Sequence, residues 1–467
     1  MLVAFLRSAR QGDLPLLVLL IALHSFLVIL SPLDTTTTAR TISRHPLSLL
    51  LLSCNSVIAS VSLSYLFVFY RRTVRTVFNN VPPPLLSLSF LTSFWNYFLL
   101  VRPVSILFRT CTARFRVLPQ VLVLGEVRCG TTTLCSHLCA TLPGCRPPFC
   151  PWKHPELDGK ETFYFAGHYF GSCVDPSYYS LCFPLRIERW FTTVLLGRPF
   201  CTFDGCAQYL SSPLAPFQLS RLYAERGLPP PLMIACVREP LQQAMSWYEY
   251  ECQAIEWAKS MCLNVPNKDL RGGEYPPNKS FKSAMDYSLS DGVRKQYELA
   301  EELAKNKDRK KGDDETRNST FPEFCFTWPG GQLGVFGRSG LFSRNVDRFE
   351  KAFGEAFPAE KKRAGGHHHF TTIVDVEDLN DYVRLEAVLR AAAEAAARGG
   401  GLLSTEQQKN IREYAERAAK RGVGGARNKG ANKDNVATEN DKIALRKIFE
   451  GEKERLETFA GRKLNWS

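Results

Sequence analysis

Charged side chains are missing from three long stretches near the start of the sequence. Leu14 to Leu33, Pro46 to Tyr70 and Val81 to Val101 contain no aspartate, glutamate, lysine or arginine. About 20 apolar residues are enough to cross the hydrocarbon core of a bilayer. The first two stretches are therefore predicted to span a membrane, whereas the third, with three prolines and Asn96, is equally well explained as an interfacial or core helix. We expect a membrane-anchor region at residues 1–112 with one to three transmembrane helices.

The arginines that flank these stretches leave the topology open. Arginine clusters at 7–10 and 71–75 lie before the first stretch and after the second, and the positive-inside rule would place both in the cytosol. A hairpin of two spans would leave the rest of the chain in the cytosol. Three spans, or a single anchor, would put everything after about Arg102 in the lumen, although three arginines between 109 and 116 argue against this. A cleaved signal peptide ending near Leu33 is an alternative, with an apolar run longer than usual.

Acidic residues are outnumbered by basic ones. The 467-residue chain has a formal charge of +13 and a pI near 9.1. This balance favours an anionic partner, which is a nucleic acid, a lipid surface, an acidic polysaccharide or a phosphorylated cofactor. A hydrophobic content of 45% excludes a chain that is disordered throughout and predicts a substantial core.

Cysteine is absent from the last 142 residues, and 14 of the 15 cysteines lie between Cys111 and Cys325. An oxidising compartment would explain such a cluster as disulfides. Zinc is the competing interpretation, but there is no CxxC pair and the spacings match no common finger. Two glycosylation sequons, at Asn278 and Asn318, agree with a lumenal location. The zinc candidates are Cys135, Cys139, Cys145, Cys150 and His154.

No internal repeat is present, and the remainder reads as one domain at residues 113–467. Residues 113–262 and 323–380 have a globular composition, and a polar insertion at about 263–322 separates them. An alanine-rich helix is predicted at 387–401, where three glycines end it, and a basic helical tail follows at 402–467.

A lysine is missing from the segment "LVLGEVRCGTTTLCSHL", which starts at Leu122. Gly125 and Gly130 are spaced as in an ATP- or GTP-binding loop, but two threonines stand where that loop has Lys and Ser/Thr. The apolar run before Gly125 predicts a strand buried on both faces. Leucines every fourth residue, from Leu134 to Leu142, predict a helix with one apolar stripe. Strand, glycine loop and helix together indicate an anion site, unless the loop is only a tight turn.

A second unit of this kind starts at Leu232. The buried strand Leu232 to Val237 is followed by Arg238, and Pro240 opens a helix that carries Ser246. Open α/β sheets bind ligands at the carboxyl edge of their strands, so Arg238 and Ser246 are expected to face the same cleft as Gly130. A surface salt bridge for Arg238 and a neutral helix position for Ser246 are the alternatives.

These segments resemble sulfotransferases that use 3′-phosphoadenosine 5′-phosphosulfate (PAPS), in particular the Golgi carbohydrate sulfotransferases. "VRCGTTTL" resembles their 5′-phosphosulfate loop, Pro-Lys-x-Gly-Thr-Thr-x-Leu, and "REPLQQAMS" resembles their 3′-phosphate element, Arg-Asp-Pro-x-x-Arg-Ala-x-Ser. "HPELDGKETFYF", "GLFSRNVDRFEKAF", "TTIVDVEDL" and the final "LRKIFEGEKERLETFAGRKLNW" resemble later segments, the last being similar to the branch with the chondroitin N-acetylgalactosamine 4-sulfate 6-O-sulfotransferase. The resemblance covers about 115–262 and 323–467. It implies an α/β, P-loop-like three-layer fold with a central parallel sheet, here preceded by N-terminal transmembrane helices.

The resemblance also implies a set of site residues. Glu161 would be the base that takes the acceptor proton, Lys160 would hold cofactor or sulfuryl oxygens, and Arg128 would stabilise the leaving group. His154 and His168 are reserve bases. A basic loop at 424–435, with Arg427, Lys429 and Lys433, is either a cover for the nucleotide or a solvated linker. The expected PAPS-binding residues are Arg128, Cys129, Gly130, Thr131, Thr132, Thr133, Arg238 and Ser246, with no metal required.

The chain departs from the family pattern at several positions. Arg128 replaces the usual lysine, which keeps the charge but supplies no useful proton. A nucleoside triphosphate crowds several negative charges at one end, whereas a phosphosulfate carries less charge there, so amides, hydroxyls and one cation can hold it. The other departures are Val127 for proline, Glu239 for aspartate, Gln243 for the second arginine and Phe342 for a tyrosine.

The expected activity is transfer of a sulfuryl group from PAPS to a glycan hydroxyl by a membrane-anchored protein of the Golgi, with its catalytic domain in the lumen. The expected partner is a glycan or proteoglycan rather than a nucleic acid. Two alternatives stay open: a P-loop-type nucleotide-dependent phosphotransferase, and a non-catalytic glycan-binding relative. The sequence leaves undetermined the acceptor, the sulfated position, the number of spans, the disulfide pairing and the oligomeric state.

Overall fold

The computed structural model describes most of the chain after residue 101 and divides it into two compact units. Unit 1 consists of Met1–Leu118, Arg146–Gly159 and Ser180–Phe191, and unit 2 of Pro119–Cys145, Lys160–Tyr179 and Thr192–Ser467. The described residues are 102–142, 144–150, 159–166, 176–197, 199–260, 281–290, 339–363, 369–397, 403–421 and 437–466, with isolated positions at 58, 99, 291, 294, 295, 298, 301 and 302.

The predicted membrane spans fall almost entirely outside these residues. Within the ranges given above, the structure contains no helix with both the length and the apolar character that a bilayer crossing requires. The sequons at Asn278 and Asn318 and the basic loop at 424–435 also lie outside the described residues.

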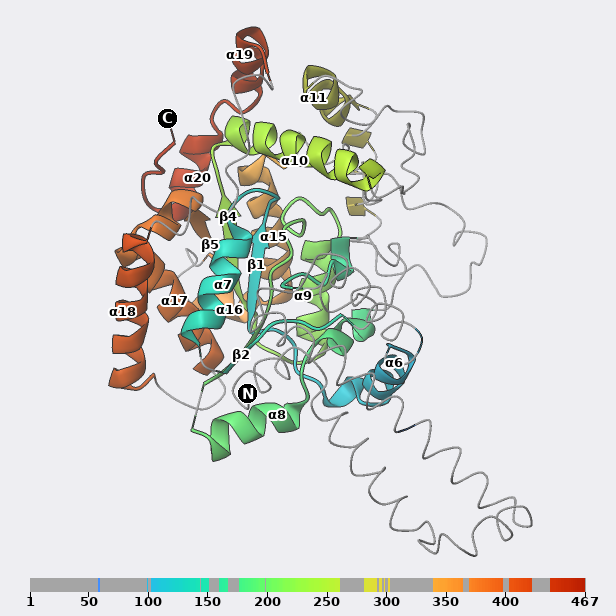
Figure 1. The fold of residues 1–467 in the computed structure, drawn as a ribbon, viewed down its shortest axis with the longest axis vertical. Helices are drawn as coiled ribbons and strands as arrows, with labels where there is room; N and C mark the ends of the chain where they lie inside the picture. The colour runs from blue at the N-terminus through green and yellow to red at the C-terminus, as the bar shows by residue number, and fades with distance from the viewer. Residues whose placement is uncertain are drawn as a thin grey trace, which may run out of the picture. The chain divides into compact units, whose positions relative to one another are not determined.

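A five-stranded sheet forms the centre of unit 2 (Figure 1), in the order β2-β3-β1-β4-β5. β1 runs parallel to β3 and to β4, and β4 runs parallel to β5. The register places Val121 beside Leu232 and Gly125 beside Cys236, so the two strands predicted from the sequence are neighbours that end together. The α/β class and the parallel sheet are confirmed. The strands are β1 (Val121–Gly125), β2 (Gly144–Arg146), β3 (Phe200–Asp204), β4 (Leu232–Val237) and β5 (Thr371–Asp375).

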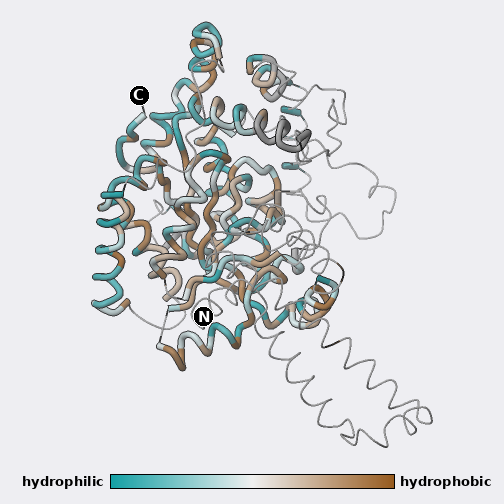
Figure 2. The backbone as a smooth tube through the Cα atoms, viewed as in Figure 1, coloured by the Kyte–Doolittle hydropathy of each residue, from teal (hydrophilic) through white to brown (hydrophobic). Residues whose placement is uncertain are grey.

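Helices cover the sheet because its central strands are apolar on both faces. All five residues of β1 are buried, as a strand in the middle of a parallel sheet must be. On one side α7 contacts β1, and α17 contacts β3, β1 and β4; on the other, α15 contacts β5 and α9 (Figure 1). Figure 2 shows the central strands as hydrophobic and α18 as largely hydrophilic. The helices are α7 (Thr131–Thr141), α9 (Ala215–Glu225), α15 (Phe342–Ala356), α16 (Pro358–Arg363), α17 (Tyr382–Ala397) and α18 (Thr405–Lys420).

Part of the predicted polar insertion is packed against the rest of unit 2. Phe281, Ala284 and Met285 of α11 share a buried cluster with Trp247 of α10 and Phe449 after α19. The described parts of the tail are mostly helical, as predicted. The helices concerned are α10 (Pro240–Ser260), α11 (Phe281–Leu289), α19 (Glu439–Ile448) and α20 (Glu452–Ala460).

Unit 1 is held together by buried arginines. Arg109 donates hydrogen bonds to the carbonyl oxygens of Leu181 and Phe149, and its guanidinium lies 4.5 Å from the centre of the Phe149 ring. Arg116 pairs with Leu185 in an antiparallel bridge, and its Nη1 donates to the Phe183 carbonyl at 2.7 Å. These contacts connect α6 (Arg102–Cys111) and η2 (Ala113–Phe115) to α8 (Arg186–Trp190), which continues into η6 (Phe191–Leu195).

The expectation of disulfides is wrong for the described cysteines, because no two of them form a disulfide with each other. Cys54, Cys173, Cys262 and Cys325 lie outside the described residues. The Sγ atoms of Cys150 and Cys182 are 3.9 Å apart, too far for a bond. Most of the described cysteines are buried, as small apolar residues of the core are. Burial also raises the pKa of the Cys206 and Cys236 thiols, the latter to about 12, which keeps them unreactive.

Candidate anion-binding active site

The loop between β1 and α7 needs its two glycines. A Cβ on Gly125 would lie 1.9 Å from the Cγ2 of Thr131, so only glycine allows the loop to fold back on the strand. Gly130 has a φ of +82°, and Arg128 also lies in the left-handed region at +72°. Arg128, which adopts this left-handed conformation without being glycine, is the residue predicted to supply the positive charge of the loop.

The N-terminus of α7 is set up for an anion. Gly130 is the N-cap residue and provides no side-chain cap, and the first helical hydrogen bond runs from the Leu134 amide to the Gly130 carbonyl. The amides of Thr131, Thr132 and Thr133 therefore point out of the helix end, where the positive end of the helix dipole adds to them. Thr132 is exposed and Thr133 half-buried, whereas Thr131 is buried.

Arg128 connects the loop to the second predicted element. Its Nε donates to the Ser246 Oγ at 3.0 Å, and Arg238 approaches from the end of β4, with its Nη1 3.5 Å from the Arg128 carbonyl oxygen. Burial, and then the charge of Arg238, lower the pKa of Arg128, partly countered by Glu249. Two like charges held this close form a region of positive potential, which an anion would stabilise.

The helix after β4 is fixed by residues that depart from the family pattern. The Glu239 carboxylate caps α10 by accepting hydrogen bonds from the amides of Leu241 and Gln242, at 3.2 and 2.6 Å. The Gln243 side chain is fully buried, and its Nε2 donates to the carbonyl of Val127 and to the Ser339 Oγ, both at 3.1 Å. Glu239 thus stabilises the start of α10, and Gln243 connects α10 to the loop after β1.

Lys160 and Glu161 lie against the same loop. The Lys160 Nζ donates to the Thr131 Oγ1 at 3.1 Å, to the Gly205 carbonyl at 2.8 Å and to the Glu161 Oε1. Burial by itself lowers the pKa of Lys160, but the Glu161 carboxylate, together with Cys135 and Cys206, raises the pKa above that of an ordinary lysine. Lys160 is therefore a fixed cation beside the first turn of α7, and Glu161 is a carboxylate with side-chain exposure of 21%.

A buried carboxylate holds the Lys160–Glu161 segment in place, which the sequence did not reveal. Asp204, the last residue of β3, accepts hydrogen bonds from the amide and hydroxyl of Thr162 at 3.1 and 2.6 Å. The hydroxyls of Tyr179 and Tyr209 also donate to it, at 2.8 and 2.9 Å. Burial raises the pKa of Asp204, and these hydrogen bonds counter the effect. The two hydrogen bonds from Thr162 to Asp204 fix Thr162, and with it the neighbouring Glu161, at the carboxyl edge of the sheet.

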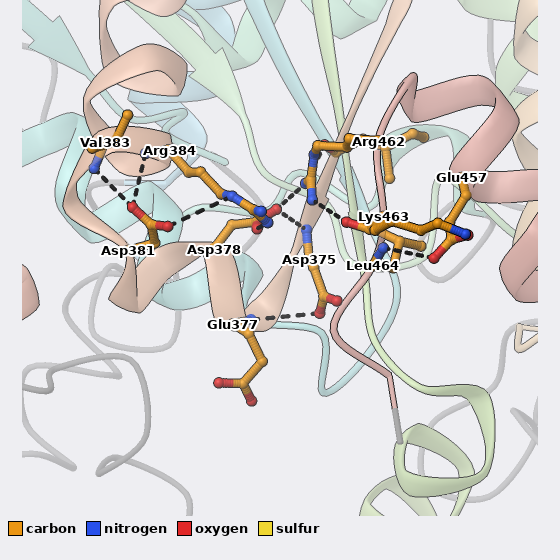
Figure 3. A network of polar contacts seen from close by, with 11 residues as sticks. Asp375, Glu377, Asp378, Asp381, Val383, Arg384, Glu457, Arg462, Lys463 and Leu464 are labelled. Carbon is orange, nitrogen blue, oxygen red and sulfur yellow. Dashed lines mark hydrogen bonds and ion pairs between the residues drawn. The ribbon is translucent and has the colours of Figure 1, made fainter.

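A second network of polar contacts, drawn in Figure 3, holds residues 376–380, and two apolar side chains of that segment lie close to Gly130. A Cβ at Gly130 would come within 2.9 Å of the Leu379 Cδ1 and 3.2 Å of the Val376 Cγ2, both from η8 (Val376–Asn380). η8 is held by Asp378, which forms ion pairs with Arg384 and with Arg462 from the tail. In the sequence, the segments that carry Asp378 and Arg462 each resembled a sulfotransferase segment, but nothing indicated that these two residues pair.

The acidic residue at the start of the loop does not oppose an anion. Glu126 is fully buried, and burial raises its pKa well above the usual range, partly countered by Ser211 and Arg348. A carboxyl with a raised pKa is neutral over more of the pH range, so it brings little negative charge to the site.

The structure brings Arg128, Gly130, Thr131, Lys160, Glu161, Arg238 and Ser246 together at one edge of the sheet. Cys129 is buried and its Sγ contacts the Val127 carbonyl oxygen, so only its backbone is available to a ligand. His154 and His168 lie outside the described residues, as do Arg427, Lys429 and Lys433. Among the residues the structure describes, no group of three or more His, Cys, Asp or Glu is placed to hold a metal ion.

Comparison with known proteins gives little further information. No protein-family model matches the sequence. No curated protein matches it either. Among solved structures, a sulfotransferase from Alicyclobacillus acidocaldarius aligns with 74% of this chain and 98% of its own, at 14% identity and a TM-score of 0.37.

Proposed function

We propose that the protein transfers a sulfuryl group from PAPS to a hydroxyl of a glycan in the Golgi lumen. The proposal depends on one observation, the contact of Arg128 with Ser246 beside Arg238. It places the loop after β1 next to the arginine and serine predicted to hold the other phosphate. One doubly phosphorylated nucleotide can then contact both elements. A loop that binds a single phosphate would not need the second element beside it.

The residues present fit such a nucleotide. The site supplies the amides at the start of α7 and three side-chain cations, Arg128, Lys160 and Arg238, in contact with the loop. Guanidinium groups and helix amides are the donors that phosphate and sulfate oxygens prefer. Burial, and then the charge of Arg238, lower the pKa of Arg128, and a bound anion would offset both effects, which supports the proposal.

Each residue then has a defined task. PAPS, when bound, supplies an activated sulfuryl group on a phosphate leaving group. Lys160 and Arg128 hold positive charge near the oxygens that become more negative as the sulfur–oxygen bond to that phosphate breaks. Glu161 accepts the proton of the acceptor hydroxyl as its oxygen forms the new bond to sulfur. The products are a sulfate ester, the bisphosphorylated adenosine PAP and a proton.

The glycan acceptor and the Golgi location are the less direct parts of the proposal. The net charge of +13 suits an acidic polysaccharide, and the charge-free stretches before residue 102 suit a membrane anchor. The cysteines lend no support to a lumenal location, because the described ones form no disulfide with one another.

Two measurements on the full chain in detergent test the function. Calorimetry should show PAP binding that does not require magnesium, and radiolabelled PAPS with a panel of glycans should label at least one of them. Binding of ATP that requires magnesium, without binding of PAP, would instead support the phosphotransferase. PAP binding without transfer to any sugar would support a non-catalytic relative.

A further inference from the structure

Unit 1 exposes an apolar surface on two of its segments. Leu107 in α6 and Phe115 in η2 are 66% and 51% exposed. Ile187, Trp190 and Phe191, along the helix that begins at Arg186, are 65%, 51% and 50% exposed. We call these five side chains the apolar face of unit 1. Large aromatic and aliphatic side chains gathered at such exposure mark an interaction surface.

The spacing shows that this exposure is a feature of the helix. Ile187, Trp190 and Phe191 stand at positions i, i+3 and i+4, which fall on one side of a helical turn. Leu185, just before the helix, is buried and forms the antiparallel bridge with Arg116. The residue before the helix is therefore packed in unit 1, whereas Ile187, Trp190 and Phe191 form an exposed apolar stripe. In Figure 2 both α6 and α8 mix hydrophobic and hydrophilic residues.

The charge of unit 1 is one-sided. Glu188 is the only acidic residue in its described part, and its Oε1 accepts the Leu185 amide at 3.1 Å. Basic residues that flank an apolar stripe suit the anionic headgroups of a bilayer, and tryptophan prefers the interfacial region. The arginines of the described part are Arg102, Arg109, Arg114, Arg116, Arg146, Arg186 and Arg189.

The chain enters this surface directly from a stretch whose sequence suits a membrane. The third charge-free stretch ends at Val101, and α6 begins at Arg102. If that stretch spans the bilayer or lies in its interface, rather than forming a core helix, α6 starts at the membrane surface. Arg109 and Arg116 then connect α6 and η2 to the segment that carries α8.

We infer that the apolar face of unit 1 rests on the lipid bilayer, with α6 and α8 as interfacial helices. Arg102, Arg186 and Arg189 would meet the anionic headgroups, whereas Arg109 and Arg116 are buried and hold the unit together. This surface is separate from the predicted membrane spans and independent of the proposed transfer reaction. It gives the protein a second attachment to the membrane in addition to its anchor.

Site-specific photocrosslinking in the full chain tests this inference. Benzoylphenylalanine would replace Phe115, Trp190 or Phe191 in protein reconstituted into vesicles of phosphatidylcholine with or without phosphatidylserine. The matched control is Tyr382 at the start of α17, an aromatic residue of unit 2 that is 44% exposed. Lipid adducts should form at the three test positions, increase with phosphatidylserine, and be absent at 382.

The same experiment identifies the other occupants. A crosslinked dimer on a denaturing gel would mean that a second copy covers the face, and an internal crosslink to residues 1–101 would mean that the chain's own N-terminal stretches do. Either result without lipid adducts overturns the inference, as does equal lipid labelling at 382. Correct folding of each variant is checked by its thermal melting profile beside that of the unsubstituted chain.

Discussion

The Nε of Arg128 donates a hydrogen bond to the Ser246 Oγ across 118 positions of sequence, at 3.0 Å. One partner belongs to the loop after β1 and the other to the helix after β4. Because β1 and β4 are adjacent and parallel, their following segments meet at one edge of the sheet. The hydrogen bond joins the two halves of the predicted nucleotide site.

The first prediction concerns Arg238. Replacing it with alanine should weaken PAP binding by more than tenfold, because a charge-assisted phosphate contact is lost. Arg238→Lys should weaken binding less, since the charge remains and only the planar fork is removed. Arg412→Ala, on the exposed side of α18, is the matched control and should leave the affinity unchanged. Calorimetric titration with PAP measures all three, and equal affinities for Arg238→Ala and Arg412→Ala would remove Arg238 from the site.

The second prediction concerns the coupling of Arg128 and Ser246. Each alanine variant should weaken PAP binding, and the double variant should lose less than the sum of the two single losses. The reason is that either substitution already frees the other partner from the shared hydrogen bond. A double-mutant cycle measured by the same titration gives the coupling. Strict additivity would show that the two side chains act on a ligand independently, if at all.

The third prediction assigns the base. Glu161→Gln should abolish transfer from PAPS while leaving PAP affinity nearly unchanged, because the amide keeps the shape of the carboxylate but accepts no proton. Glu161→Asp keeps the carboxylate but shortens it, and should retain partial turnover. Initial rates with labelled PAPS, beside PAP titrations of each variant, provide the test. Lost affinity with surviving turnover would show that Glu161 binds nucleotide and is not the base.

The fourth prediction concerns Gly130 and η8. Gly130→Ala should weaken PAP binding, because a Cβ would meet the Leu379 Cδ1 at 2.9 Å and the left-handed backbone costs alanine roughly 1–2 kcal/mol. Leu379→Ala in the same chain should recover part of the loss by removing the steric overlap but not the backbone strain. PAP titration of the single and double variants distinguishes the two causes. No recovery at all would mean that the backbone conformation alone explains the effect.

The fifth prediction concerns pH and Asp375. Burial is the main reason that the pKa of this carboxyl is raised to about 6, and Asp378 adds to it. The folded state therefore holds the proton more tightly than the unfolded chain, so the stability contributed by Asp375 decreases as pH rises from about 4 to 6 and stays low above that. Asp375→Asn should raise the melting temperature at pH 8, and the gain should shrink toward pH 4.5. A gain that is independent of pH would contradict the raised pKa.

The sequence predicted the parts of the site that depend on local patterns. The apolar runs at Val121 and Leu232 gave β1 and β4, and the leucine stripe gave α7. Their placement side by side followed from the rule that parallel strands share a carboxyl edge. The grouping of Arg128, Arg238 and Ser246 was predictable for the same reason, although their roles in binding stay predictions.

The parts that could not be predicted depend on pairings across long stretches of chain. Asp204 meets Thr162 from 42 positions away, and Arg462 meets Asp378 from 84 positions away. Neither pair has a periodicity or spacing that marks it. The disulfide expectation was wrong for the described cysteines because a cysteine count carries no information on whether a thiol is simply buried in the core, as that of Cys236 is.

The ion pair between Asp378 and Arg462 has a consequence for the order of folding during biosynthesis. The η8 segment that packs near Gly130 is tied to a residue far later in the chain. A chain emerging from the ribosome can form the strands and the turn around Gly130 first, but it acquires this tie only after Arg462 has emerged as well. The final geometry of the turn is therefore completed late, after the sheet strands on either side of it have been synthesised.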